Sequence, residues 1–174
     1  SQGKNNERIA QKYETLKQYT FLRQEMHRDT IPYNVGGEKD DLYERLGGSI
    51  LLKVEDAGKA YYVHPSRRQL YFLGRPKDAF GIMRVHGIGI TNAHLEQIPI
   101  GSLETFGDTY SPSSFAQKHL GKIFLQVENS GEAWYVHPKD GRRYYLGRPA
   151  DALEIMKHIS VGITNDNFDL FVRD

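Results

Sequence analysis

The sequence contains no cysteine, and that absence removes several kinds of chemistry at once. Disulfide bonds, thiolate nucleophiles and zinc sites built on cysteine are all excluded. The absence fits a protein of a reducing compartment and fits equally an envelope protein that avoids thiols. The composition therefore excludes thiol chemistry but does not identify the cellular compartment.

Long hydrophobic runs are also missing. No stretch of the sequence is both long enough and apolar enough to span a bilayer. The chain begins with Ser1 rather than methionine, so a signal peptide or membrane anchor upstream is left open. We expect any membrane attachment to come only through such an upstream anchor.

Neither sign of charge is in excess. The 23 Lys and Arg residues nearly balance the 22 Asp and Glu residues, which gives a net charge of +1. Binding to nucleic acid or to an anionic membrane surface is driven by a clear excess of positive charge. We therefore expect no nucleic-acid partner.

Recognisable catalytic motifs are absent as well. The sequence has no Gly-x-Ser-x-Gly elbow, no His-Glu-x-x-His motif, no phosphate-binding loop and no calcium-binding loop. We therefore predict a protein that is not an enzyme and that carries no metal or cofactor.

The chain does have enough apolar residues to form packed cores. Hydrophobic residues make up 39% of its 174 residues, and the 11 tyrosines outnumber the 8 phenylalanines and 1 tryptophan. Tyrosine serves in cores, but its apolar body and polar tip also suit surfaces that bind other molecules. Aromatic residues are thus candidates for both roles.

An internal repeat organises most of the sequence. Gly58 begins a segment that recurs from Gly131, which lies 73 positions further along the chain. The same offset relates residues 58–65 to 131–138, 71–79 to 144–152, and 89–92 to 162–165. The match needs no insertion or deletion, which indicates a duplication. We call residues 39–98 the first repeat and residues 113–174 the second repeat.

Both repeats show the same order of predicted elements. A capped helix (40–46 and 113–120) precedes a first strand (50–55 and 123–128), a second strand that ends at His-Pro, and a third strand (70–73 and 143–146). A helix follows from Pro76 and Pro149, and a short turn or helix opens at Gly89 and Gly162. We predict an α+β fold of two tandem α-β-β-β-α modules, each a three-stranded antiparallel sheet plus a helix.

Two segments lie outside the repeats. Within residues 1–38, apolar residues recur at spacings of three and four between Asn5 and Arg28, which predicts an amphipathic N-terminal helix followed by a linker. This helix either docks on the modules or serves as a stalk or self-association element. Residues 99–112 are rich in Gly, Ser and Pro and are predicted to link the two repeats.

Histidines and charged residues that occur in both repeats are candidates for an anion-binding or structural site. They are His64, Arg75 and Asp78 in the first repeat and His137, Arg148 and Asp151 in the second. Each histidine stands alone before a proline, which favours a hydrogen-bonded structural role over metal binding. The Arg and Asp residues flank a helix start, where exposed N–H groups attract anions. Glu55 and Glu128 are the expected partners of the arginines.

Four aromatic residues form the candidate ligand or partner surface. Tyr61 corresponds to Trp134, and Phe72 corresponds to Tyr145, so both positions stay aromatic in each repeat. A three-stranded sheet with one helix is covered on only one face. The other face needs the other repeat, the N-terminal helix or an external ligand, and internal packing remains an alternative at these positions.

Part of the second repeat resembles a known kind of repeat, and this resemblance indicates a location for the protein. The run Val127–Val136, followed by Asp140–Ala152, resembles a short repeat of bacterial secreted and envelope proteins. Its hairpin half is also similar to the aromatic cell-wall-binding repeats of choline-binding proteins. The resemblance implies the bacterial cell envelope, the periplasm or the extracellular space, and it implies no particular activity.

These features together favour a non-catalytic binding or scaffolding module. We expect it to attach a protein partner or a cell-wall glycan, with the protein partner narrowly preferred. The alternative is a hydrolase of wall polymers that uses His64 or His137 with nearby carboxylates. A further alternative is self-association through the N-terminal helix.

Overall fold

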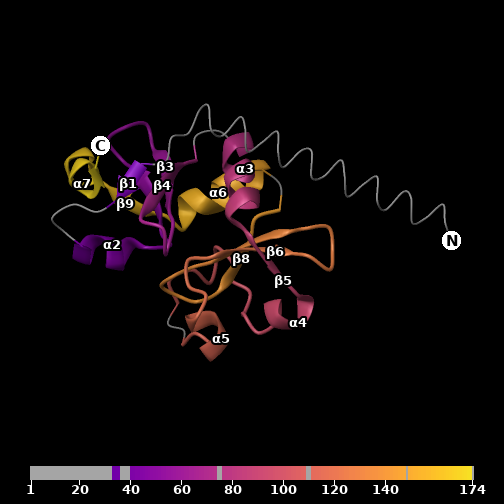
Figure 1. Cartoon of the computed structure of the whole chain (residues 1–174). Helices are drawn as coiled ribbons and strands as arrows, with labels where there is room; N and C mark the ends of the chain where they lie inside the picture. Colours follow the sequence, from indigo (N-terminus) through magenta and orange to yellow (C-terminus); the bar gives the residue numbers. More distant parts are fainter. Residues whose placement is uncertain (1–32, 36–39, 74–75, 109–110, 148, 174) are drawn as a thin grey trace.

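The computed structural model describes residues 33–35, 40–73, 76–108, 111–147 and 149–173. The protein has an α+β fold with two β-sheets and helices around them (Figure 1). The predicted N-terminal helix lies outside the described residues. Tyr33–Val35, in the segment predicted to be a linker, forms strand β1.

The elements follow the same order in both repeats. The first repeat holds α2 (Asp40–Leu46), β2 (Ile50–Lys53), β3 (Lys59–Val63), β4 (Gln69–Phe72), α3 (Pro76–His86), β5 (Ile88–Ile90) and α4 (Asn92–Leu95). The second repeat holds α5 (Ser114–Gln117), β6 (Ile123–Gln126), β7 (Ala133–Val136), β8 (Arg143–Tyr145), α6 (Pro149–His158), β9 (Val161–Ile163) and α7 (Asn165–Phe171), with β10 (Val172–Arg173) at its end.

Local sequence explains the turns and helix starts. Gly58 and Gly131 adopt positive φ angles of 67° and 80° in the turns that join the first two strands of each repeat. Thr91 and Thr164 cap helices α4 and α7, because each side chain accepts a hydrogen bond from a backbone N–H of the first turn. These positions correspond at the repeat offset.

The last strand of each repeat belongs to the sheet of the other. The first sheet has the order β10-β1-β4-β3-β2-β9, and the second has the order β5-β6-β7-β8. Strand β5 pairs in parallel with β6, and β9 pairs in parallel with β2. The two repeats therefore exchange strands reciprocally within one chain.

This exchange corrects the expectation of only a turn or helix from Gly89 and Gly162. Helices α4 and α7 do begin at Asn92 and Asn165, but three-residue strands precede them. Three residues are too few to show a strand period in sequence, and their partners lie in the other repeat. The antiparallel order β2-β3-β4, with its counterpart β6-β7-β8, follows the predicted pattern.

The two sheets meet at a pair of glycines. A Cβ atom added at Gly48 would lie 2.5 Å from the Cα atom of Gly121, so the two backbones touch. The Tyr62 hydroxyl donates to the Gly121 carbonyl at 2.7 Å, and the Tyr135 hydroxyl donates to the Gly48 carbonyl. The contacts repeat in both directions, so this junction lies on an approximate two-fold axis.

The inner faces of both sheets and the two long helices form one core. Helices α3 and α6 lie side by side between the sheets (Figure 1). The cluster draws Tyr62 and Tyr71 from the first sheet and Tyr135 and Tyr144 from the second, together with residues of both helices. Neither repeat buries its inner face without the other.

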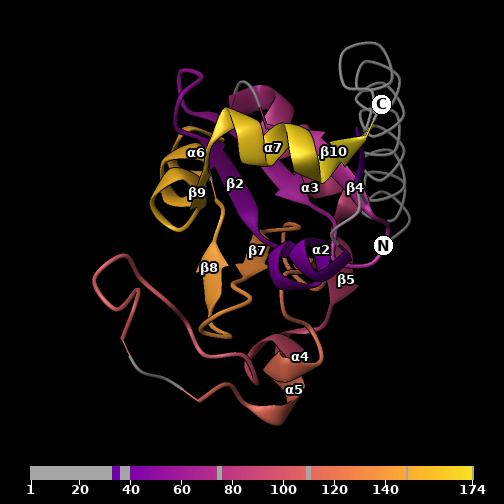
Figure 2. The same cartoon turned by 90° about the vertical axis from the view of Figure 1, so that its left-hand side faces the viewer.

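The outer faces are covered by different helices. Leu51, Tyr61 and Val63 of the first sheet are buried with Phe168 and Phe171 of α7, which crosses that face in Figure 2. On the second sheet, α4 and α5 contribute to a separate cluster of buried residues, namely Ile90, Leu95, Ile98, Ala116, Phe124 and Val136. Most of each outer face is therefore packed internally.

Candidate functional site

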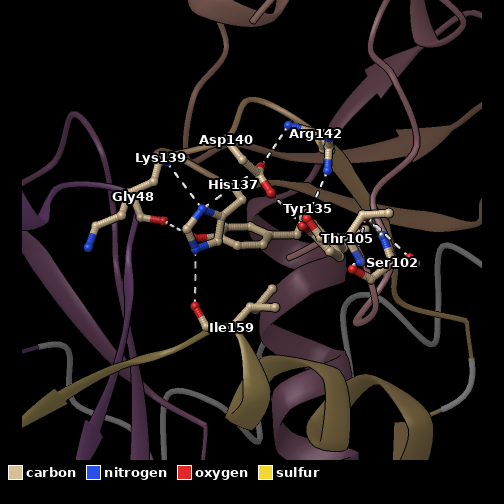
Figure 3. Close-up of polar contacts among 10 residues, drawn as sticks. Gly48, Ser102, Thr105, Tyr135, His137, Lys139, Asp140, Arg142 and Ile159 are labelled. Atoms are coloured by element: carbon tan, nitrogen blue, oxygen red, sulfur yellow. Dashed lines mark hydrogen bonds and ion pairs between the residues drawn. The ribbon is translucent and has the colours of Figure 1, made fainter. Parts of the chain in front are cut away.

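His137 is held at the end of β7 inside the protein (Figure 3). Its side chain is 3% exposed. The Lys139 backbone N–H donates to Nδ1 at 3.1 Å, and Nε2 lies 3.1 Å from the carbonyl oxygen of Ile159. A neutral ring with its proton on Nε2 satisfies both partners. His137 thus ties the end of β7 to the segment after α6.

Asp140 extends this network on the Nδ1 side. Its Oδ1 accepts the Arg142 backbone N–H at 2.9 Å, and its Oδ2 accepts the Tyr144 hydroxyl. Burial lowers the pKa of His137, although the Ile159 carbonyl and the Asp140 carboxylate act in the opposite direction. Burial and the bond to Asp140 raise the pKa of Tyr144. The polar groups of His137, Asp140 and Tyr144 thus bond within the protein, which is typical of a structural network.

His137 should make the protein sensitive to acid. Because its folded pKa is below the ordinary value, the unfolded chain takes up the proton first once the pH falls below about 6.5. Stability from the neutral ring is complete above that pH and is lost as the pH falls toward the lower folded pKa. We expect His137→Gln to make the stability loss on acidification shallower by up to about 1.4 kcal/mol per pH unit.

Urea unfolding between about pH 7.5 and 5.5 measures this dependence. His158→Gln is the matched control, because His158 is exposed at the end of α6. His64 and His119 also have pKa values lowered first by burial, so some acid sensitivity should persist in His137→Gln. Identical pH slopes in the two variants would contradict the role given to His137.

His64 occupies the corresponding position in the first repeat but is more open. Its Nδ1 accepts the backbone N–H groups of Ser66 and Arg67, each at 3.2 Å. Its ring lies at centroid distances of 6.5 Å from Tyr71 and 5.8 Å from His86. Among the described residues, no group of three or more His, Asp or Glu side chains is arranged to hold a metal ion.

Most of the charged residues predicted at the helix starts lie outside the described part of the structure. Arg75 and Arg148 lie outside the described residues, and so do the side chains of Asp78 and Asp151. The repeated glutamates have a visible role of their own. Oε2 of Glu55 accepts the Asn165 backbone N–H at 2.8 Å, and Oε2 of Glu128 accepts the Asn92 backbone N–H at 2.7 Å. Each carboxylate thus caps a helix supplied by the other repeat.

The aromatic pair of the first sheet packs in the outer cluster, with Tyr61 buried and Phe72 partly buried. Tyr61 is 6% exposed, and its ring centroid lies 4.8 Å from that of Phe168 and 5.2 Å from that of Phe72. Phe72 packs against the same outer cluster. Helix α7 covers this face of the sheet, for which the sequence indicated no particular covering element. We therefore no longer assign these two rings to the candidate ligand surface.

The equivalent pair of the second sheet is more open to solvent, through Tyr145. Tyr145 is 46% exposed, and its ring lies 5.0 Å from that of the partly buried Trp134. The Arg143 guanidinium carbon lies 4.2 Å from the Trp134 ring centroid, and Arg143 Nε donates to the Ile98 carbonyl at 2.7 Å. Arg143 itself is buried, at 9% exposure, so we call Trp134 and Tyr145 the aromatic surface and Arg143 its buried support.

A chain of amide side chains lies beside the aromatic surface. Trp134 Nε1 donates to Gln126 Oε1 at 3.1 Å, and Gln126 Nε2 donates to Asn92 Oδ1 at 2.8 Å. Asn92 Nδ2 in turn donates to Asn129 Oδ1 at 3.3 Å. Asn92 comes from the first repeat and the other members come from the second. Strand exchange therefore completes this polar edge, which sequence reasoning missed.

Comparison with protein-family models, curated proteins and solved structures finds no match for this chain. Within the part of the chain that is described, no helix is long and apolar enough to cross a membrane. The candidate site thus rests on its own geometry. That geometry selects the aromatic surface on the outer face of the second sheet.

Proposed function

We propose that this protein is a non-catalytic binding or scaffolding module whose contact site is the aromatic surface. The observation that carries the proposal is the contrast between two equivalent aromatic pairs. Tyr61 is 6% exposed beneath Phe168, whereas its counterpart Trp134 is partly buried, and Phe72 is partly buried, whereas its counterpart Tyr145 is 46% exposed. A large aromatic side chain left open on an otherwise packed face is typical of a contact residue.

The scaffold proposed for this role is a pair of tandem α-β-β-β-α modules behind an amphipathic N-terminal helix. The constant sequence offset supports the duplication, as do the reciprocal contacts at Gly48 and Gly121. The exchanged strands β5 and β9 make the two modules one rigid support for the aromatic surface. The N-terminal helix would present this support.

The histidines give no support to the alternative of a wall-polymer hydrolase. Both ring nitrogens of His137 have partners, and the ring is 3% exposed. A general base must reach a substrate proton directly or through one water molecule. In His64, Nδ1 accepts hydrogen bonds from two backbone N–H groups of its own turn. Both histidines are better suited to fixing the strand ends.

The bacterial cell envelope, periplasm or extracellular space is the proposed location, on the resemblance of the repeat to envelope proteins. The proposed partner is a protein or a cell-wall glycan. An aromatic surface flanked by amide side chains suits either class, because rings supply apolar contact and amides supply directional hydrogen bonds.

Co-sedimentation with an insoluble bacterial envelope fraction tests the proposal. We expect the protein to sediment with the fraction and Tyr145→Ala to remain in the supernatant. The half-exposed ring contributes mainly its contact with Trp134, so Tyr145→Ala should lose only about 1 kcal/mol of stability. Leu170→Ala is the control, because Leu170 is a 55% exposed apolar residue on α7. Equal sedimentation of both variants would rule the aromatic surface out.

A further inference from the structure

We propose that the aromatic surface and its amide chain bind a neutral glycan, with a pyranose ring stacked on Tyr145. This inference deepens the proposed function and depends on it. It departs from the narrow preference for a protein partner that the sequence favours. The reasons lie in how the second sheet differs from its own duplicate.

The first sheet shows what the same scaffold looks like when its outer face is closed. Lys53 occupies the position equivalent to Gln126, and Asp56 occupies the position equivalent to Asn129. Lys53 Nζ lies 3.3 Å from the Asp56 carboxylate and 4.5 Å from the ring centroid of Phe168. The Lys53–Asp56 ion pair and the covering ring of Phe168 therefore leave no open ligand surface at this position.

The second sheet replaces the ion pair with amides and the partly buried Phe72 ring with an exposed one, and its charged residue at the Trp134 ring, Arg143, is buried. Gln126 and Asn129 carry amides in place of the Lys53–Asp56 ion pair. Tyr145 stands in place of Phe72 and gains a hydroxyl while losing cover. Amides beside an exposed ring match the surface of a neutral sugar, which alternates C–H patches and hydroxyl groups.

The Tyr145 ring is already fixed in position for stacking. It lies against Trp134, with interplanar angle 51°, and an added Cβ at Gly147 would collide with the ring. Trp134 is fixed in turn by the Arg143 guanidinium and by its bond to Gln126. A ligand therefore meets a preordered ring, so little side-chain entropy is lost on binding.

The amide chain leaves hydrogen-bonding groups unused. A primary amide has two N–H donors. Among the described residues, the bonds of Gln126 and Asn92 use one N–H each, so one donor remains on each side chain. Both side chains lie along one edge of the aromatic surface, to which the Trp134–Gln126 bond connects them. Hydroxyl and acetamido oxygens of a glycan are the acceptors they fit.

Intrinsic fluorescence gives a direct test, because Trp134 is the single tryptophan of the sequence. The full chain is titrated with a cello-hexasaccharide and a chito-hexasaccharide, both neutral and β-linked. We expect a saturable change in Trp134 emission with at least one of them. Tyr145→Leu should weaken the affinity about tenfold, whereas Tyr145→Phe should retain it because the ring remains.

A second arm separates failure of the ligand class from failure of the proposed function. The envelope fraction is tested before and after protease treatment. Sedimentation that survives the protease and is lost in Tyr145→Leu supports the glycan. Loss of sedimentation on protease treatment, with no response of Trp134 to either sugar, overturns the glycan and leaves a protein-binding module. Sedimentation that Tyr145→Leu does not alter overturns the aromatic surface and both proposals.

Discussion

Replacing Gly48 by alanine should destabilise the protein by about 3 kcal/mol or more, which corresponds to roughly 10 °C in thermal midpoint. Gly48 has a φ of +81°, a region that costs an L-residue about 1 kcal/mol. The new methyl would also lie 2.5 Å from the Cα atom of Gly121. Flexible side chains can move aside, but here backbone meets backbone at the junction of the two sheets.

Gly131→Ala is the matched control for this effect. Gly131 has nearly the same φ, +80°, but an added Cβ there meets nothing within 4 Å. We expect it to lose only the conformational cost of about 1 kcal/mol. Chemical denaturation of the two variants measures the difference. Equal losses would mean that the close approach of Gly48 and Gly121 does not constrain the fold.

Separating the two repeats should abolish folding of each. A break between Gly107 and Asp108, both exposed, yields fragments 1–107 and 108–174. The second fragment loses β5, the parallel partner of β6, and the first loses β9, the parallel partner of β2. Each also exposes its half of the shared core. We expect both fragments alone to lack a cooperative unfolding transition.

An equimolar mixture of the fragments should recover the native circular dichroism spectrum and one cooperative transition, because each supplies the strand that the other lacks. The intact chain serves as the reference for both signals. A fragment that unfolds cooperatively by itself, with a stability close to that of the intact chain, would show that the repeats are independent and that the strand exchange is incidental.

Much of the local structure follows from the sequence because its causes are local. The alternation in β3, with Tyr62 facing the core and Tyr61 facing outward, matches the period of a strand. Helix α2 has the predicted bounds Asp40–Leu46. Turn glycines with positive φ, such as Gly58 and Gly131, stand where the hairpins were expected.

The exchange of strands was beyond sequence reasoning for a physical reason. Strands β5 and β9 are three residues long, and each is stabilised by an edge that lies in the other repeat. Neither local propensity nor periodicity carries information about such a partner. The caps that Glu55 and Glu128 provide were missed for the same reason, since they span 110 and 36 residues.

The candidate site was visible in sequence only as four aromatic positions. Tyr61 is buried, Tyr145 is exposed, and Phe72 and Trp134 are partly buried. The burial of Tyr61 depends on Phe168 of α7, which reaches the first sheet through the strand exchange. One signal was present: the repeats differ at Lys53/Gln126 and Asp56/Asn129, so charge in one copy is replaced by amides in the other. This difference between the duplicates is the sequence signal that points to the second sheet.

The most direct test of the account compares Tyr145→Ala with its counterpart Phe72→Ala in two assays, thermal unfolding and envelope co-sedimentation. We expect Tyr145→Ala to lower the thermal midpoint by only a few degrees and to lose binding. Phe72→Ala should lower stability by about 3 kcal/mol, because its ring packs on Tyr61 in the outer cluster, yet bind when folded. A Tyr145→Ala protein that unfolds early, or that binds as well as the parent, would contradict the assignment of this ring to a contact surface.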